Sequence, residues 1–219
     1  MKRLITLSLL LLTILLLGAC TDDYNAAEDM YEHLEKSVEL ESSFKSAQSE
    51  LGEIEKQENE IYDEMMEINM NELDQIQGLA DEALSLAENR KDLIEQEKES
   101  IDAAKEEFNQ IEQYLDELSD ETKEKANQMI EEMEKRHQSF NDLYDAYTHS
   151  INLDIELYEM LKNEDLKKAD LDEQVDRVNT SYQEVKSAQD KFNQHTGQFN
   201  DLKKEFYESS GLNVEFEEE

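Results

Sequence analysis

The chain has 219 residues and is strongly acidic, with 57 Asp and Glu residues against 21 Lys and Arg residues and a formal net charge of −36. Such a chain repels nucleic acids and anionic lipid surfaces, because proteins bind both through Lys and Arg. We therefore exclude nucleic-acid binding. High charge with 37% hydrophobic residues is compatible with disorder, so the fold depends on how the apolar residues are ordered along the chain.

The first part of the chain has the features of an export signal. Lys2 and Arg3 form a short basic region, and the apolar segment 4–17 that follows carries no charge. This segment has the length of a signal-peptide core and is shorter than a transmembrane helix, which needs roughly 20 apolar residues. An ordinary cleaved signal peptide and an uncleaved membrane anchor are the alternatives to the lipoprotein signal that the next residues indicate.

The apolar segment ends in a lipobox, Leu17-Gly18-Ala19-Cys20. Leu17, Gly18 and Ala19 are the expected signal-peptidase recognition residues, because small residues before the cysteine let the chain lie extended in the enzyme. The Cys20 thiol is then joined to a diacylglyceryl group. Its two acyl chains give stable attachment, where a single chain binds only marginally. We therefore predict lipidation at Cys20 and attachment to the membrane through that lipid.

Cys20 is the only cysteine in the chain, so no disulfide can form within it, and lipidation leaves no thiol for metal or redox chemistry. The sequence then divides into four parts. We expect a lipoprotein signal peptide at 1–19, a lipidated cysteine with a short linker at 20–26, a helical bundle domain at 27–212 and an acidic tail at 213–219.

Apolar residues in the expected domain recur every three or four positions, which is the spacing of one face of an α-helix. Four long segments show this pattern, at 30–68, 76–118, 126–161 and 171–206. In the second segment, steps of three and four alternate without a break from Ile101 to Leu118, as in a coiled-coil seam. The first stripe contains one charged residue, Glu58. Its other members are Met30, Leu34, Val38, Phe44, Ala47, Leu51, Ile54, Ile61, Met65 and Ile68.

Residues that cap helices mark the ends of these segments. Asn71 is placed to begin the second segment, Ser119 the third, and Asp170 with Glu173 the fourth, while Gly211 ends the fourth. The joints are short, which favours antiparallel neighbours, and a bundle buries all four stripes within one chain. The sequence therefore predicts an all-α fold, an elongated antiparallel bundle of about four long, coiled-coil-like helices.

A search for catalytic and metal-binding patterns finds none. The four histidines, His33, His137, His149 and His195, lack the i,i+4 spacing of a zinc pair. His137 and His195 fall near stripe positions, and we expect them to be packed or boundary residues. Carboxylates are so frequent that no pair is informative, and a narrow bundle offers no obvious pocket to shift the pKa of a catalytic acid. We therefore predict a protein that is not an enzyme, with no catalytic residues, no metal site and no cofactor.

Aromatic residues gather in the last two segments, where a sugar-stacking surface is one interpretation. Their helical spacing favours the core instead. The residues concerned are Phe140, Tyr144, Tyr147, Tyr158, Tyr182, Phe192, Phe199, Phe206 and Tyr207. We expect Tyr62, Tyr114 and Tyr207 to carry the most exposed rings.

Several stretches of the sequence form a distinctive set. They are the lipobox, MYEHLEK at 30–36, YDAY and SINLD within 144–154, ELYEML at 156–161, and FY with GLNV within 206–214. Together they resemble the YkyA family of cell-wall-binding lipoproteins of bacilli. The resemblance covers nearly the whole chain after the lipobox and is most specific at 144–161. It implies a Gram-positive surface protein on the outer face of the cytoplasmic membrane, facing the cell wall, and it brings no catalytic residues.

The predicted function is that of a membrane-anchored extracellular lipoprotein, a non-catalytic module that binds the cell wall or serves as an envelope scaffold. Its partners are then a cell-wall polymer or an envelope protein. Because wall teichoic acids and this chain are both polyanions, we expect bridging Mg²⁺ or Ca²⁺, which prefer carboxylate oxygens. The alternatives are an acidic cation-binding or halotolerance surface protein, or an adaptor for a partner protein. An enzyme or solute-binding protein is a third interpretation, which a deep pocket lined by a buried charged pair would favour.

Overall fold

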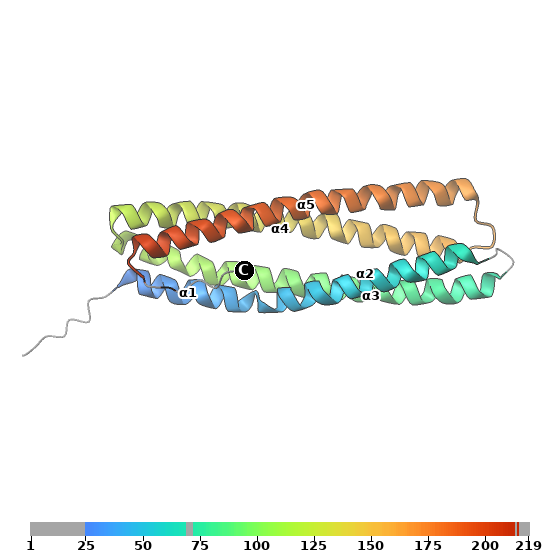
Figure 1. Cartoon of the computed structure of the whole chain (residues 1–219), viewed down its shortest axis with the longest axis horizontal. Helices are drawn as coiled ribbons and strands as arrows, with labels where there is room; N and C mark the ends of the chain where they lie inside the picture. The colour runs from blue at the N-terminus through green and yellow to red at the C-terminus, as the bar shows by residue number, and fades with distance from the viewer. Residues whose placement is uncertain (1–24, 69–71, 213, 215–219) are drawn as a thin grey trace, which may run out of the picture.

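A computed structural model of the chain describes residues 25–68, 72–212 and 214, and all secondary-structure elements in these ranges are helices (Figure 1). The lipobox residues Leu17, Gly18, Ala19 and Cys20 lie outside the described residues, as does most of the expected tail. The elements are α1 (Ala26–Leu40), α2 (Ser42–Glu67), α3 (Leu73–Phe108), the 3₁₀ helix η1 (Asn109–Glu117), α4 (Asp120–Leu161) and α5 (Lys168–Ser209).

The helices form four antiparallel rods, which confirms the predicted all-α bundle (Figure 1). The rods are α1 with α2, α3 with η1, α4, and α5. Helix α5 packs mainly on α4, α4 also packs on α3, and α3 packs on α1 and α2. Helices α4 and α5 have 42 residues each. At a rise of about 1.5 Å per residue, each is therefore roughly 60 Å long.

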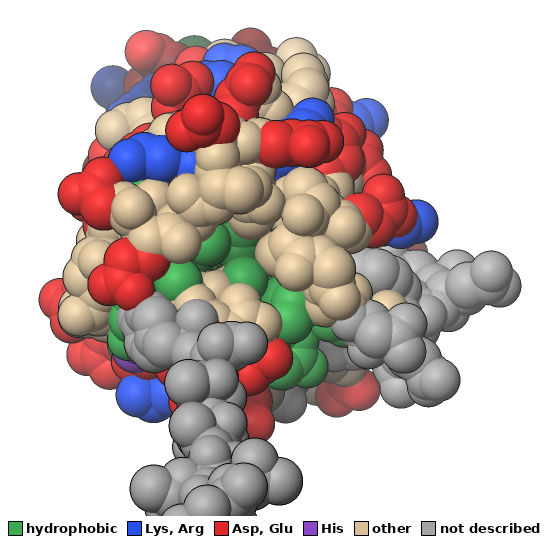
Figure 2. All heavy atoms as spheres, turned by 90° about the vertical axis from the view of Figure 1, so that its left-hand side faces the viewer, with side chains coloured by type: hydrophobic (Ala, Val, Ile, Leu, Met, Phe, Trp, Pro, Cys, Tyr) green, Lys and Arg blue, Asp and Glu red, His purple; other side chains and the backbone are tan. Residues whose placement is uncertain are grey.

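The two ends of the bundle differ in which helix termini they hold. Figure 1 shows the start of α1, the turn from η1 to α4 and the end of α5 at one end, which we call the proximal end. The end of α2, the start of α3 and the loop from α4 to α5 lie at the other, the distal end. Seen from the proximal end, acidic side chains surround a small group of hydrophobic side chains (Figure 2).

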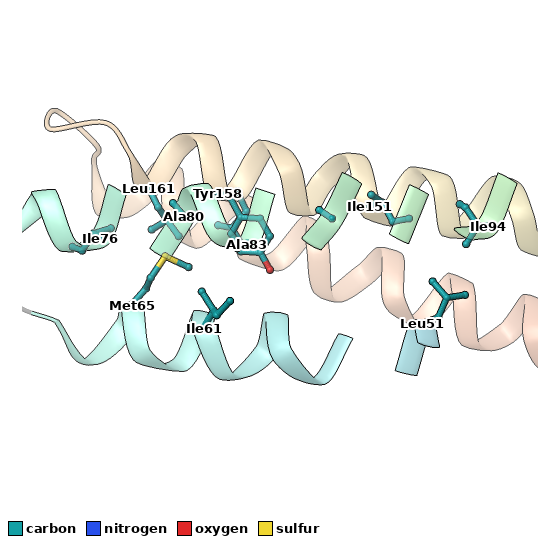
Figure 3. Close-up of a cluster of buried hydrophobic side chains, with 12 residues drawn as sticks. Leu51, Ile61, Met65, Ile76, Ala80, Ala83, Ile94, Ile151, Tyr158 and Leu161 are labelled. Atoms are coloured by element: carbon teal, nitrogen blue, oxygen red, sulfur yellow. The ribbon is translucent and has the colours of Figure 1, made fainter. Parts of the chain in front are cut away.

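The apolar stripes meet in three clusters along the bundle axis. The distal cluster joins α2, α3 and α4, and in Figure 3 Ile61 and Met65 point toward Ala80 and Ala83 of α3 and toward Tyr158 of α4. The central cluster consists of Ile101, Phe140 and Phe192, against which Phe44 packs. The proximal cluster contains Met30, Leu34, Phe108, Ile111, Met129, Phe199, Phe206 and Tyr207. Apolar burial along the whole length therefore holds the four rods together.

The first rod departs from the predicted single helix. It is interrupted at Glu41, between the end of α1 at Leu40 and the start of α2 at Ser42. Val38, which was expected in the apolar stripe, is 48% exposed, so that prediction is wrong. Ser37 takes the buried position instead, and its hydroxyl donates to the backbone oxygen of Ala104 at 2.8 Å.

The helix ends confirm two of the predicted caps. The Ser119 hydroxyl accepts a hydrogen bond from the backbone N–H of Thr122, as an N-cap does. Gly211 has a φ of +73°, and the N–H of Leu212 donates to the oxygen of Tyr207 at 3.1 Å, which is the Schellman arrangement. The N-cap of α3 is Glu72, and the expected cap Asn71 lies outside the described residues.

The predicted capping pair Asp170 with Glu173 is wrong. Helix α5 begins at Lys168 with Lys167 as its N-cap, so Asp170 lies within the first turn. An acid in that turn is favourable because it faces the positive end of the helix dipole.

The prediction that Tyr207 carries one of the most exposed rings is also wrong. Its ring is 1% exposed and packs against Tyr31 with 5.5 Å between the ring centroids.

Candidate functional site

The interior of the bundle holds an arginine whose side chain is completely buried. Arg90 of α3 has 0% exposure. It lies between Ala87 and Ile94, at steps of three and four, so it occupies a seam position of the helix that an apolar residue would ordinarily fill. A charge in such a place requires partners, because the loss of hydration is otherwise too costly.

Each of the other three rods supplies a partner to Arg90. Its Nη1 donates to the carboxylate of Glu58 from α2 and, at 3.0 Å, to Oδ2 of Asp154 from α4. Its Nη2 donates to the hydroxyl of Tyr182 from α5 at 3.1 Å. Glu58 and Asp154 are themselves buried. The four side chains form a polar layer across the apolar core, which we call the Arg90 cluster.

Two tyrosines extend the cluster. The guanidinium carbon of Arg90 lies 5.2 Å from the ring centroid of Tyr147, a cation–π distance. The hydroxyl of Tyr147 donates to Glu55, whose carboxylate lies 3.7 Å from Nη2 of Arg90. The hydroxyl of Tyr182 donates to Oδ2 of Asp154 at 2.7 Å. A single cation thus faces three carboxylates, two of them deeply buried.

Two polar atoms of the cluster lack a hydrogen-bond partner. They are Oε1 of Glu58 and Nε of Arg90, in side chains that are 3% and 0% exposed. An unpaired buried polar atom costs about 1–3 kcal/mol. Native proteins keep few of them, and such atoms often mark a place for a proton, a water or a ligand.

The electrostatics follow from burial. Loss of hydration raises the pKa of Glu58 to about 7, although the Arg90 cation acts in the opposite direction. Burial also raises the pKa of Asp154, against the hydrogen bond from Tyr182 and the charge of Arg90. Burial alone would lower the pKa of Arg90, but the surrounding Tyr182, Tyr147 and carboxylates raise it above its ordinary value. Arg90 therefore stays charged, and Glu58 can hold a proton near neutral pH.

Two cavities flank the cluster and share Glu55 and Tyr182 in their walls. The larger has a volume of about 450 Å³ and lies among α2, α3, α4 and α5. Its walls combine apolar and tyrosine side chains with a few polar ones, Gln48, Glu97, Lys186 and Gln189. The smaller, of about 170 Å³, contacts Glu55, Glu58 and Asp154 and three tyrosine rings, Tyr62, Tyr158 and Tyr182.

Glu97 is a further buried acid, in the wall of the larger cavity. It is 5% exposed, and burial raises its pKa to about 7, although a hydrogen bond from Gln48 at 2.9 Å lowers it. Both cavities thus contain a carboxyl group that changes charge near neutral pH. The expectation that a narrow bundle lacks a pocket able to shift a carboxyl pKa was wrong, since Glu97 lines the larger cavity and burial raises its pKa.

Three histidines pair with carboxylates at the boundary of the bundle, as expected for His137 and His195. The pairs are His33 with Glu107, His137 with Asp102 and His195 with Glu132, at 2.7, 2.9 and 2.6 Å. Among residues 25–68, 72–212 and 214, no group of three or more His, Cys, Asp and Glu side chains is arranged to hold a metal ion. The same part of the chain contains no helix with both the length and the apolar character of a membrane span.

The Arg90 cluster was not predicted, although one of its members left a trace in the sequence. Glu58 was the single charged residue in the first apolar stripe. Arg90 and Asp154 also stand at stripe spacing, between Ala87 and Ile94 and between Ile151 and Tyr158. Complementary charges at seam positions on separate helices were therefore the available signal. The sequence does not reveal that they lie at the same level of the bundle.

Fold and cluster together define the class of protein, an elongated all-α bundle whose apolar core is crossed by a buried polar layer. The YkyA family model, described as "Putative cell-wall binding lipoprotein", matches residues 25–209. The chain is also 31% identical over 201 residues to the "Uncharacterized lipoprotein YkyA" of Bacillus subtilis strain 168, covering 91% of this chain and 90% of that protein. The chain therefore belongs to the YkyA family, and membership in a lipoprotein family implies a membrane-anchored place in the cell envelope.

A solved structure has the same fold. It is the crystal structure of a conserved protein of unknown function from Staphylococcus aureus, with a TM-score of 0.60 and 15% sequence identity. The match covers 82% of this chain and 91% of that chain. At this identity the likeness concerns the fold alone.

Proposed function

We propose that the protein is a non-catalytic module of the bacterial cell envelope, anchored through a lipid on Cys20 to the outer face of the cytoplasmic membrane and in contact with the cell wall. The observation that carries this proposal is the family match over residues 25–209, directly after a segment that ends in a lipobox. Two acyl chains on Cys20 would give the stable attachment that such a role requires.

The geometry of the bundle suits this role. Four residues lie between Cys20 and Asn25, the N-cap of α1, and a fully extended stretch of these five steps spans about 17 Å. The proximal end would then stand close to the membrane, and the distal end roughly 60 Å farther out. The α4–α5 loop at 162–167 and the neighbouring helix ends would face the wall.

Lipidation is tested by labelling growing cells with radioactive palmitate and recovering the protein. We expect label on the wild-type chain in the membrane fraction and none on Cys20→Ser. The variant Thr21→Ala, next to the lipidation position, is the control and should be labelled normally. Label on Cys20→Ser, or an unlabelled wild type in the culture medium, would refute the anchor.

Wall contact is tested by sedimentation with purified cell walls. Wall polymers and the protein are both anionic, so we propose that Mg²⁺ or Ca²⁺ bridges single carboxylates of the two surfaces. Binding should then appear with millimolar Mg²⁺ or Ca²⁺ and disappear with chelator. Binding that is unchanged by chelator would rule out the bridge but keep the wall contact, whereas no binding in either condition would contradict both.

A further inference from the structure

The two cavities beside the Arg90 cluster differ in chemistry but adjoin, since Glu55 and Tyr182 belong to both walls. We propose that together they bind a small amphiphilic organic amine, with its ammonium group in the smaller cavity and its hydrocarbon part in the larger one. This site is separate from the proposed wall contact and does not depend on it.

The smaller cavity favours a cation by charge. Carboxylates of Glu55, Glu58 and Asp154 line it, and Arg90 is the one cation that the described residues place against all three. Oε1 of Glu58 has no hydrogen-bond partner, although the residue is 3% exposed. An ammonium group carries three donors and would satisfy this acceptor while balancing the excess negative charge. The same carboxylates would repel an anionic ligand.

The aromatic residues of the smaller cavity support the same class of ligand. Tyr62, Tyr158 and Tyr182 contribute to its wall. Tyrosine faces attract organic cations, and cages of aromatic rings bind ammonium ligands in other proteins. A bare metal ion is a poorer match, because no group of three or more metal-binding side chains is suitably arranged in the described part of the chain.

The larger cavity supplies room for an apolar body. Leu51, Ile94, Leu143 and Val185 are among its lining residues, together with the rings of Phe140, Tyr144 and Tyr147. Its volume of about 450 Å³ lies within the range of roughly 300–1,000 Å³ that is common for small-molecule sites. Gly52 also belongs to this wall, and a Cβ atom added there would meet nothing within 4 Å. A larger side chain at this position would therefore reduce the space for a ligand.

The proposal is tested by calorimetric titration of the full chain in phosphatidylcholine nanodiscs, with empty nanodiscs as the blank. The probes are hexylamine, hexanol and hexanoate, which have six carbon atoms each and differ in charge. We expect one hexylamine site per chain and at least tenfold weaker binding of hexanol and hexanoate. Equal affinity for hexylamine and hexanol would show that the carboxylates do not contribute to binding. The absence of hexylamine binding at millimolar concentration would overturn the proposal.

Paired variants separate the site from the acidic surface. Glu55→Gln should weaken hexylamine binding at least tenfold, and Glu95→Gln, which removes an exposed carboxylate of α3, should not change it. Gly52→Leu should also weaken binding at least tenfold. Gly197→Leu makes the same change at an exposed helical glycine of α5 with open space around it, and should leave binding intact. Equal losses for the two glutamate variants would show that the general negative charge of the protein holds the amine. Equal losses for the two glycine variants would show that misfolding abolishes binding. Either result would refute the site.

Discussion

Arg90 connects all four rods through side chains that meet in the dry interior. Its guanidinium has donors for Glu58, Asp154 and Tyr182 at once, and its planar face lies over the ring of Tyr147. A lysine has a single charged centre and cannot reproduce this geometry. Buried ion pairs add little net stability, but the removal of one partner leaves an uncompensated charge.

We therefore expect Arg90→Met to lower the free energy of unfolding by roughly 3–5 kcal/mol, because Glu58 and Asp154 would remain buried without their cation. Urea denaturation at pH 7, followed by circular dichroism, measures the change. Lys91→Met removes an exposed charge from the next position of α3 and should cost less than about 1 kcal/mol. Similar losses for the two variants would mean that the cluster is not a stabilising unit.

Glu97 gives a prediction about pH. Burial raises its pKa from 4.5 to about 7, so between these pH values the folded state holds a proton that the unfolded chain has released. Stability is therefore lost as the pH rises from about 4.5 to 7, and the loss is complete above that range. Glu97→Gln should therefore be as stable as the wild type at pH 5 and more stable at pH 8, by about 2 kcal/mol. The exposed Glu95→Gln should show no such difference, and a Glu97→Gln benefit of equal size at both pH values would contradict the explanation.

At the scale of elements, the interruption between α1 and α2 is fixed by contacts from other helices. Arg136 of α4 is buried and donates to both carboxylate oxygens of Glu41, each at 2.7 Å. The hydroxyl of Ser100 on α3 donates to the backbone oxygen of Leu40 at 2.6 Å, which satisfies a carbonyl at the end of α1. The break is therefore stabilised from outside the first rod.

Removal of the Glu41 charge tests this junction. We expect Glu41→Gln to lower the free energy of unfolding by about 1–3 kcal/mol, since Arg136 would lose a charged partner in a mostly buried place. Hydrogen exchange should also quicken at the amides around 37–44 before it changes elsewhere. Glu39→Gln alters a nearby exposed residue and should leave both measurements unchanged. Uniformly faster exchange along the chain would contradict a local role.

Several ion pairs also connect helices rather than neighbours on one helix. Lys36 of α1 donates to Glu107 of α3 at 2.8 Å, and Arg177 of α5 donates to Glu156 of α4 at 3.1 Å. Exposed pairs of this kind contribute little individually. With 57 acids beside 21 Lys and Arg residues, pairs such as these reduce the repulsion between adjacent rods.

At the scale of the whole molecule, the net charge of −36 opposes the compact state. Acidic side chains surround even the apolar centre of the proximal end (Figure 2). Added salt screens this repulsion, since the Debye length falls from about 8 Å at 0.15 M to about 3 Å at 1 M. The surface should therefore tolerate high salt, whatever partner it binds.

We expect the melting temperature to rise by several degrees between 0.05 and 1 M NaCl, because self-repulsion decreases. Choline chloride at the same concentrations should have a similar effect if screening is the cause. Stabilisation by Na⁺ alone would instead indicate specific cation binding, as in the halotolerance alternative. A melting temperature that does not change with either salt would show that repulsion among the surface carboxylates does not measurably destabilise the fold.

The local sequence determined the helices, because the apolar spacing and caps such as Ser119 and Gly211 act within a few residues. It also indicated the family, through stretches such as 144–161. The break at Glu41 and the exposed Val38 were not predictable in this way, since they depend on contacts with α3 and α4. The Ser100 hydroxyl and the Ala104 carbonyl of α3 and the Arg136 guanidinium of α4 make these contacts.

Only the tertiary structure decided where the buried charges meet. The hydrogen-bonded pairs among Glu58, Arg90, Asp154 and Tyr182 are far apart in the sequence. The separation runs from 28 positions for Tyr182 with Asp154 to 92 positions for Arg90 with Tyr182. These side chains meet because the four rods pack in one particular register along the bundle axis. The spacing of residues in the sequence does not specify that register. The cavities have the same origin, because the space between helices depends on which side chains face one another after packing.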